Sequence, residues 1–194
     1  MANRLKVLVF DDTAHHRQAA TLLLSKDYDL TVVGTYDEAQ NALNAVMDFD
    51  IVLTDLLVPA SQQAMSEQGQ KFVGQEMPLG TIIALLALCN GVKKVAVVTD
   101  MDHHNHPSSA AFDCFKDKEC RLRGINIMCT NRPGIVTIDK ATGKLVERAF
   151  LETNRGKKKY PYPPGESWGK REGLSYGKNW KRVLLQLTGE LKTE

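Results

Sequence analysis

Residues 49–59 carry the sequence FDIVLTDLLVP, and this segment decides the fold. Its apolar run from Ile51 to Leu53 predicts a strand that is covered on both faces of a parallel sheet. Asp55 follows at the carboxyl end of that strand, and Pro59 ends any regular element soon afterwards. Because ligands and reacting groups gather at the carboxyl ends of strands in open α/β sheets, Asp55 is a candidate functional residue.

A second predicted strand, residues 5–10, also ends in acids, because Asp11 and Asp12 follow it directly. If the two strands lie side by side, the carboxylates of Asp11, Asp12 and Asp55 share one crevice. Carboxylates this close repel one another unless a cation lies among them, and hard oxygen ligands suit Mg²⁺. The three aspartates are therefore the predicted ligands of a magnesium site.

The order of the predicted elements indicates the fold class. Apolar runs bounded by turn residues predict strands at residues 5–10, 30–33, 51–54, 95–98 and 125–129. Helical spacing of apolar residues predicts helices at residues 13–26, 37–47, 78–91 and 107–122, with Asp37 as the N-cap of the second helix. The polar residues 60–76 are expected to form a long loop. Alternating strands and helices favour an α/β fold with right-handed βαβ units and a parallel sheet.

The C-terminal third departs from this alternation. Residues 135–139 and 144–149 flank a Lys-Ala-Thr-Gly turn and predict a β-hairpin. Residues 155–176 are rich in Gly, Pro, Lys and Tyr and are expected to be largely irregular. Helical periodicity returns at residues 179–191, which we expect to cover the sheet after the fifth strand. The predicted organisation is a core at residues 1–133, a hairpin and basic Gly/Pro/aromatic insertion at residues 134–178, and a C-terminal helix at residues 179–194 that packs back on the core.

Composition narrows the functional classes. The 194 residues favour one domain with an elaboration, and a formal net charge of +2 argues against a general binder of polyanions. Four cysteines without a CxxC pair suit a reducing compartment, so a cytoplasmic protein is expected. The longest apolar run, residues 82–89, is too short to span a bilayer, so no membrane segment is expected.

The first two-thirds of the chain resembles the receiver domain of two-component response regulators. The residues that carry the resemblance are the pair Asp11 and Asp12, Asp55 with Pro59 four residues on, Thr99 after the fourth strand, and Arg132 with Pro133 after the fifth. The resemblance implies a five-stranded, flavodoxin-like, doubly wound sheet. It also implies that Asp55 is the phosphoacceptor, that Asp11 and Asp12 hold Mg²⁺, that Thr99 is the switch hydroxyl, and that a histidine kinase or another protein is the partner.

Two residues depart from the receiver pattern. The family places a lysine where this chain offers Arg132, with the register shifted by one residue, so Arg132 is the candidate cation of the pocket. Arginine presents a planar fork rather than a point charge, and the exchange is not conservative. Asp100 follows Thr99 where the family usually has a small residue, and its charge would oppose an incoming phosphoryl group.

A basic stretch at residues 155–182 contains nine Lys or Arg residues against two Glu, interleaved with five Tyr or Trp residues. Such a mixture can bind single-stranded nucleic acid through phosphate contacts and stacking. The same residues could instead form an arm that wraps a partner subunit, or could pack back on the domain with the lysines facing water. We favour the last two interpretations, so a protein partner or a homodimer is expected rather than nucleic acid.

Enzymatic alternatives remain open. His103, His104 and His106 lie in a predicted loop at the same edge of the sheet, so they could bind a transition metal and, together with the acids, serve a metal-dependent phosphohydrolase. A solvated polar loop is the simpler interpretation of these histidines. Residues 7–13 are also similar to the nucleophile motif of the haloacid dehalogenases, but here the acids are adjacent rather than spaced by one residue.

The leading hypothesis is a divergent receiver-like signalling protein that responds to Mg²⁺ and to phosphorylation at Asp55 and acts through protein contacts. Its only enzymatic activity would be the phosphorylation and dephosphorylation of Asp55, assisted by Thr99 and Arg132. The alternative is a pseudo-receiver, an interaction module that keeps the fold and is not phosphorylated. The two hypotheses differ in one measurable property, the phosphorylation of Asp55.

Overall fold

The computed structural model describes residues 4–45, 48–62, 65–100, 106–111, 114, 119–122, 124–130, 134–147 and 173–191. Within these residues the main sheet has six strands in the order β2-β1-β3-β6-β8-β7. Five of them are parallel: β1 (Lys6–Phe10), β2 (Asp29–Val33), β3 (Ile51–Asp55), β6 (Lys94–Val98) and β8 (Ile125–Thr130). This is the strand order of flavodoxin-like sheets. The predicted α/β class with a five-stranded parallel sheet is confirmed.

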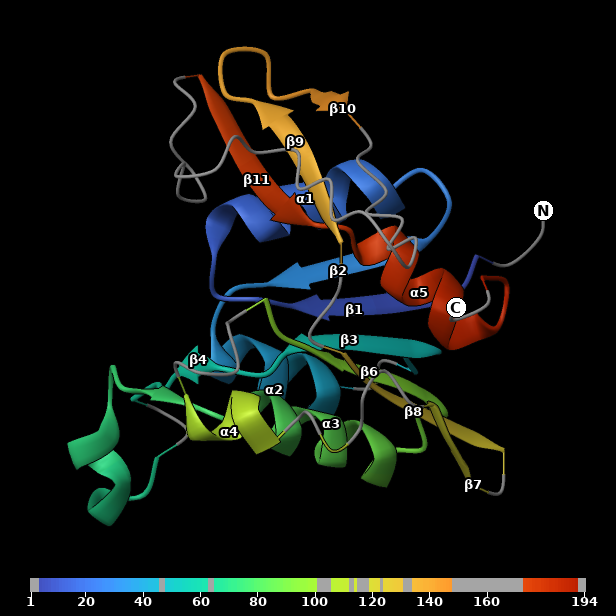
Figure 1. Ribbon diagram of the computed structural model, residues 1–194. Coiled ribbons are helices and arrows are strands. Elements are labelled where there is room, and N and C mark those ends of the chain that lie inside the picture. The colour runs from blue at the N-terminus through green and yellow to red at the C-terminus, as the bar shows by residue number, and fades with distance from the viewer. Residues whose placement is uncertain are drawn as a thin grey trace.

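Helices cover both faces of the main sheet, as the alternation of strands and helices predicts (Figure 1). The helices α1 (Ala14–Leu24) and α5 (Trp180–Thr188) lie on one face, and α2 (Tyr36–Asn44) and α3 (Leu79–Cys89) lie on the other. Successive β1 residues alternate between the two cores, with Val7 and Val9 facing α1 and α5, and Leu8 facing α2 and α3. None of the described helices is long and apolar enough to span a membrane.

The predicted helix at residues 107–122 is wrong at its C-terminal end. Within the described residues, Pro107–Ala111 form the helix α4, whereas Glu119–Leu122 form the strand β7, which pairs antiparallel with the outer edge of β8. A turn that contains Gly124 at φ 82° brings β7 back beside β8. Pairing of this segment with a free sheet edge outweighs its local helical pattern.

Two smaller predictions on the α2–α3 side need correction. The N-cap of α2 is Thr35 rather than Asp37, because the Thr35 hydroxyl accepts the Glu38 N–H at 3.2 Å and the Glu38 carboxylate accepts the Thr35 N–H at 3.1 Å. The predicted loop at residues 60–76 contains the 3-10 helix η1 (Glu67–Phe72). Its ends are tied by the short antiparallel strands β4 (Val58–Pro59) and β5 (Glu76–Met77).

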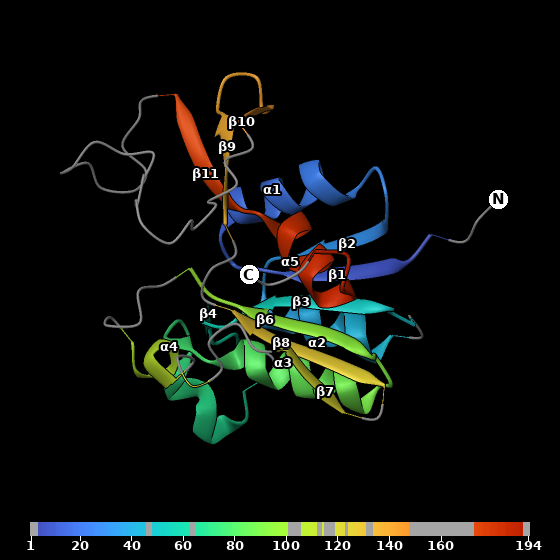
Figure 2. The same cartoon turned by 45° about the vertical axis from the view of Figure 1, so that its right-hand side comes forward.

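A second, three-stranded sheet lies beyond α1, in the order β10-β9-β11 (Figure 2). The strands β9 (Ile135–Asp139) and β10 (Leu145–Glu147) form the predicted hairpin. The strand β11 (Leu174–Lys178) pairs antiparallel along the whole of β9, so the prediction of irregular structure is wrong at its C-terminal end. The rest of the basic stretch, residues 155–172, lies outside the described residues. Since α5 begins two residues after β11 ends, the chain returns from the small sheet to the main sheet at this point.

Candidate functional site: an acidic pocket closed by a buried lysine

The three predicted aspartates meet at the carboxyl edge of the main sheet. Asp11 follows β1, Asp55 ends β3, and these two strands pair directly. Asp11, Asp12 and Asp55 can each place one carboxylate oxygen within 4.8 Å of the others. Asp11 and Asp55 are buried and Asp12 is half-buried, so the group is open to solvent on the Asp12 side. This geometry matches a divalent cation that keeps some of its water ligands.

The cation inside this pocket is Lys178, the last residue of β11. Its Nζ atom lies 2.8 Å from Asp11 Oδ2, 2.8 Å from Asp55 Oδ2 and 3.2 Å from Asp100 Oδ1. The residue is only 1 % exposed, so the ammonium group exchanges water for three carboxylate partners. Asp11, Asp55 and Lys178 therefore form one buried electrostatic unit, and Asp100, whose side chain is 46 % exposed, lies at its solvent edge.

Sequence reasoning placed this role on Arg132, which lies outside the described residues. The sequence did not predict Lys178 for this role, because the strands of the small sheet separate it in the chain from β8, the fifth parallel strand. One feature of the sequence does point to Lys178. Lys178 stands directly before the helix that was predicted to cover the sheet after the fifth strand, so it ends the insertion at the place where the core resumes.

Contacts to α1 hold the backbone of Lys178 in place. A Cβ atom on Gly177 would collide with the Cβ of Ala19 and come within 3.0 Å of the His15 carbonyl oxygen. The Lys178 backbone N–H donates to Nδ1 of His16 at 3.2 Å, and the Trp180 indole N–H donates to the His16 carbonyl at 3.0 Å. Strand β11 therefore lies so close to α1 that the residue before Lys178 has to be glycine.

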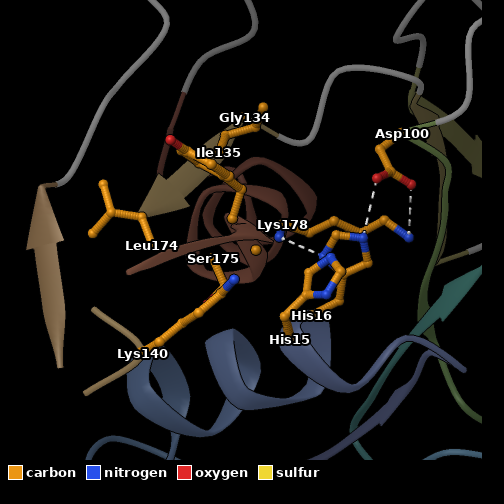
Figure 3. Close-up of a pocket in the computed structure, with 11 residues that line it drawn as sticks. His15, His16, Asp100, Gly134, Ile135, Lys140, Leu174, Ser175 and Lys178 are labelled. Atoms are coloured by element: carbon orange, nitrogen blue, oxygen red, sulfur yellow. Dashed lines mark hydrogen bonds and ion pairs between the residues drawn. The ribbon is translucent and has the colours of Figure 1, made fainter. Parts of the chain in front are cut away.

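His16 links Lys178 to Asp100. Because Nδ1 of His16 accepts the Lys178 N–H, its hydrogen sits on Nε2, which donates to Asp100 Oδ2 at 3.0 Å. The other oxygen of Asp100 faces the Lys178 ammonium group (Figure 3). Asp100, which the sequence suggested would only repel a phosphoryl group, is thus held by two donors.

Burial and mutual charge shift the pKa values of these groups. Burial raises the pKa of Asp55 to about 8, with a further contribution from the charge of Asp11, against the opposing effect of Lys178. Partial loss of water acts in the same direction on Asp100, although its side chain is 46 % exposed, but the hydrogen bond from His16 and the charge of Lys178 outweigh it and lower the pKa of Asp100. Burial alone would lower the pKa of Lys178, whereas the charges of Asp55, Asp11 and Asp100 raise it. The lysine therefore stays charged, and Asp55 is the carboxylate that holds a proton near neutral pH.

The backbone of Asp55 is fixed from the α3 side. The Gly80 N–H donates to the Leu56 carbonyl at 3.1 Å, and a Cβ atom on Gly80 would collide with the Asp55 carbonyl oxygen. The Leu56 N–H in turn donates to Asp55 Oδ1 at 2.8 Å, which leaves Oδ2 for Lys178. The two oxygens of the Asp55 carboxylate thus have separate, fixed partners.

The remaining predicted residues fall into two groups. Thr99 is buried at the end of β6, one residue beyond Val98, which pairs with Asp55 across the sheet, so it lies at the same edge as the acids. Its backbone N–H donates to the Thr130 carbonyl at 3.0 Å. His103 and His104 lie outside the described residues, and Nδ1 of His106 accepts the backbone N–H of Ser108 at 3.1 Å. That bond explains His106 as a local cap at the start of α4.

Substitution of Gly177 by alanine is expected to disturb the pocket without touching any charged residue. The added methyl group would push β11 away from α1, destabilise the fold by about 1–3 kcal/mol and move Lys178. Urea denaturation gives the change in stability. Fluorescence of Trp180, whose ring centre lies 5.6 Å from the Lys178 Nζ, reports the movement, in a Trp168→Phe background. Gly69→Ala in η1 is the control, since the atoms nearest to its new Cβ atom belong to the Met65 side chain, at 3.2 Å or more. An unchanged Trp180 signal in Gly177→Ala would contradict the close packing of β11 on α1.

No protein family and no curated protein matches this chain. Among solved structures, a fusion that carries the trimeric coiled coil of yeast Spc42 is 15 % identical over 57 % of this chain, with a TM-score of 0.40, and this chain spans 59 % of its length. A response regulator receiver protein from Pseudomonas putida is 26 % identical over 57 % of this chain and 80 % of its own, with a TM-score of 0.34. A complex of the P1 domain of CheA3 with CheY6 from R. sphaeroides is 18 % identical over 69 % and 85 %, with a TM-score of 0.38. Because these TM-scores are low, we base the proposals that follow on the contacts within this chain alone.

Proposed function

We propose that this protein is a divergent receiver-like signalling protein, a switch that responds to Mg²⁺ and to phosphorylation at Asp55 and acts through protein contacts. The observation that carries the proposal is the placement of one buried ammonium group, Lys178 Nζ, at 2.8 Å from both Asp11 and Asp55. A pocket of acids with one fixed cation can accept a phosphoryl group, because the cation and a metal ion neutralise the added charge.

The residues of the pocket fit the roles that phosphoryl transfer requires. Asp11, Asp12 and Asp55 would hold Mg²⁺, and the bound metal would neutralise charge on the phosphoryl oxygens. Asp55 Oδ2 is the proposed nucleophile. Its oxygen forms a bond to phosphorus while the bond from phosphorus to the donor's leaving group breaks. Lys178 then exchanges its contact with Asp55 for one with a phosphoryl oxygen, and the Thr99 hydroxyl is the proposed second contact.

The proposed switch acts through β11. Lys178 ends this strand, and the strand is hydrogen-bonded along all of β9 and packed on α1. A change in the partners of the Lys178 ammonium group would therefore shift β11, and with it both the small sheet and its contacts with the main sheet. We propose that the surface presented to a protein partner, such as a histidine kinase or an effector, includes this sheet.

A second candidate function is a pseudo-receiver that keeps the fold but is not phosphorylated. The observation that favours it is the third partner of Lys178, since Asp100 Oδ1 lies 3.2 Å from Nζ and adds a charge beside Asp55. A pocket whose lysine is already neutralised by several carboxylates resists an incoming anion. The two candidates differ in whether Asp55 accepts a phosphoryl group.

Incubation of the protein with acetyl phosphate and Mg²⁺ separates the two functions. We expect the intact mass to increase by one phosphoryl group, because Asp55 is the nucleophile and Mg²⁺ lowers the repulsion around it. The adduct should be absent from Asp55→Asn and should depend on the metal. Asp29→Asn is the matched control, since Asp29 is an exposed aspartate at the start of β2 and should leave the adduct unchanged.

Two other outcomes decide against the switch. An adduct that persists in Asp55→Asn would place the chemistry elsewhere in the chain. If the wild type takes up no phosphoryl group but Asp100→Ala does, the pseudo-receiver is correct and the Asp100 carboxylate is what blocks the reaction.

A further inference from the structure

A cavity of about 320 Å³ lies between the first turn of α1 and the small sheet (Figure 3). This volume lies near the lower end of the range for small-molecule sites, which is about 300–1,000 Å³. Its polar lining includes His15, His16 and Lys140, and its apolar lining includes Ile135 and Leu174. The cavity lies mainly against the insertion that carries β9 and β11, and it adjoins the acidic pocket at the sheet edge through His16, Asp100 and Lys178.

Two polar groups in this cavity lack hydrogen-bond partners within the described part of the chain. The ring of His15 makes only an edge-on contact with the His16 ring, with their centres 4.3 Å apart. The Lys140 side chain extends from the β9–β10 hairpin toward the side where the two imidazoles lie (Figure 3), and it forms no ion pair with a described acid. The cavity thus offers one ammonium donor and one imidazole donor to a ligand.

Asp100 also borders the cavity, and both of its carboxylate oxygens have donors. Its two oxygens face Nε2 of His16 at 3.0 Å and Nζ of Lys178 at 3.2 Å. Lys140 is therefore the charge in the lining that has no described counter-ion. The walls near it are the aliphatic side chains of Ile135 and Leu174, which cannot satisfy a polar ligand but can cover an apolar one.

We propose that this cavity binds a small organic monocarboxylate with a compact apolar group. The carboxylate would accept hydrogen bonds from Lys140 and His15, and the apolar group would lie against Ile135 and Leu174. The charge-assisted hydrogen bond from Lys140 would orient the ligand and contribute to its affinity, and burial of the apolar group would contribute the remainder of the affinity.

The cavity shares His16, Asp100 and Lys178 with the acidic pocket, so the two sites are coupled. In the absence of metal, the carboxylates of Asp11 and Asp55 partly neutralise the charge of Lys178. Mg²⁺ bound to these carboxylates would neutralise them instead, so the positive charge of Lys178 would act more strongly on a ligand in the cavity. The carboxylate should therefore bind more tightly in the presence of Mg²⁺, and by reciprocity it should strengthen Mg²⁺ binding. This coupling, unlike the binding itself, rests on the proposed function.

Isothermal titration with benzoate tests the site. Benzoate should bind the wild type, whereas benzylamine, which has the same ring with the opposite charge, should not. Lys140→Met keeps most of the side-chain length without the charge and should weaken benzoate binding about tenfold. Lys144→Met, in the same hairpin and outside the cavity lining, should leave the affinity unchanged. Saturating Mg²⁺ should strengthen benzoate binding by about fivefold.

The possible failures are distinguishable. Absence of benzoate binding, equal binding of benzylamine, or full affinity in Lys140→Met would each overturn the cavity site. Benzoate affinity that does not change in Mg²⁺, in a sample where Trp180 fluorescence shows that the metal is bound, would overturn the coupling. Absence of any Mg²⁺ binding would contradict the proposed function and leave the benzoate result to decide the cavity site.

Discussion

Replacement of Lys178 by methionine is expected to destabilise the fold by about 3–5 kcal/mol at pH 7, because it leaves the buried Asp11 carboxylate and the buried Asp55 carboxyl group without the ammonium group that lies 2.8 Å from each. Asp11 is fully buried and Asp55 is 6 % exposed, so water cannot replace the lost partner at either side chain. Methionine has nearly the same length as the lysine stem, so the loss reports the charge and its hydrogen bonds rather than a cavity. Urea denaturation followed by Trp180 fluorescence measures the change.

The pH dependence of this loss provides an internal check. In acid the stranded carboxylates take up protons and become neutral, so Lys178→Met should approach the stability of the wild type as the pH falls toward about 4. Lys181→Met is the control in the same segment, since Lys181 pairs with Asp27 on the surface at 2.7 Å. Exposed pairs contribute little, and the control should not measurably shift the denaturation midpoint. Equal stability of Lys178→Met and the wild type at pH 7 would show that Lys178 is not the counter-charge of the acids.

Periodicity and strand-end logic were sufficient to predict the fold and the acids. The apolar runs at Val7–Phe10 and Ile51–Thr54 can be satisfied only by strands with both faces covered, and right-handed βα connections leave their carboxyl ends at one edge. Neither signal depends on the connecting loops, so local sequence alone predicts that Asp11, Asp12 and Asp55 meet.

The cation could not be predicted in the same way, because its position depends on a contact far along the chain. Lys178 reaches the pocket only because β11 packs on α1 and pairs with β9, and both interactions are long-range. The helix predicted from local spacing is also wrong at β7, because this segment pairs with the open edge of β8. In both cases tertiary pairing decides a choice that the local sequence leaves open.

Magnesium affinity is expected to rise steeply with pH up to about 8 and then level off. Burial raises the pKa of Asp55 to about 8, so below this pH the carboxyl group holds a proton that Mg²⁺ has to displace. With one proton released per metal bound, the affinity rises about tenfold per pH unit well below pH 8, and about fiftyfold between pH 6 and pH 8 because half of the Asp55 carboxyl groups are ionised at pH 8. A titration that follows Trp180 fluorescence at each pH, in the Trp168→Phe background, measures this slope.

The stability of the metal-free protein should change in the opposite direction. A carboxyl group whose pKa is higher in the folded state than its ordinary value of about 4 stabilises the fold fully below pH 4. That contribution is lost as the pH rises toward 8, where ionised Asp55 faces Asp11 with one lysine between them. Mg²⁺ should therefore stabilise the protein more at pH 8 than at pH 6.

Asp55→Asn identifies the titrating group, because it keeps the shape of the side chain and removes the proton. In this variant Mg²⁺ should bind weakly through Asp11 and Asp12, and the affinity should lose its steep rise between pH 6 and pH 8. If the slope persisted in Asp55→Asn, another carboxylate would be the group that holds the proton, with half-buried Asp12, whose pKa is raised by burial and by Asp11, as the first alternative. A slope that disappears with Asp55 would mean that metal binding and the readiness of Asp55 to react are controlled by the same proton, because only the ionised carboxylate can coordinate Mg²⁺ or attack phosphorus.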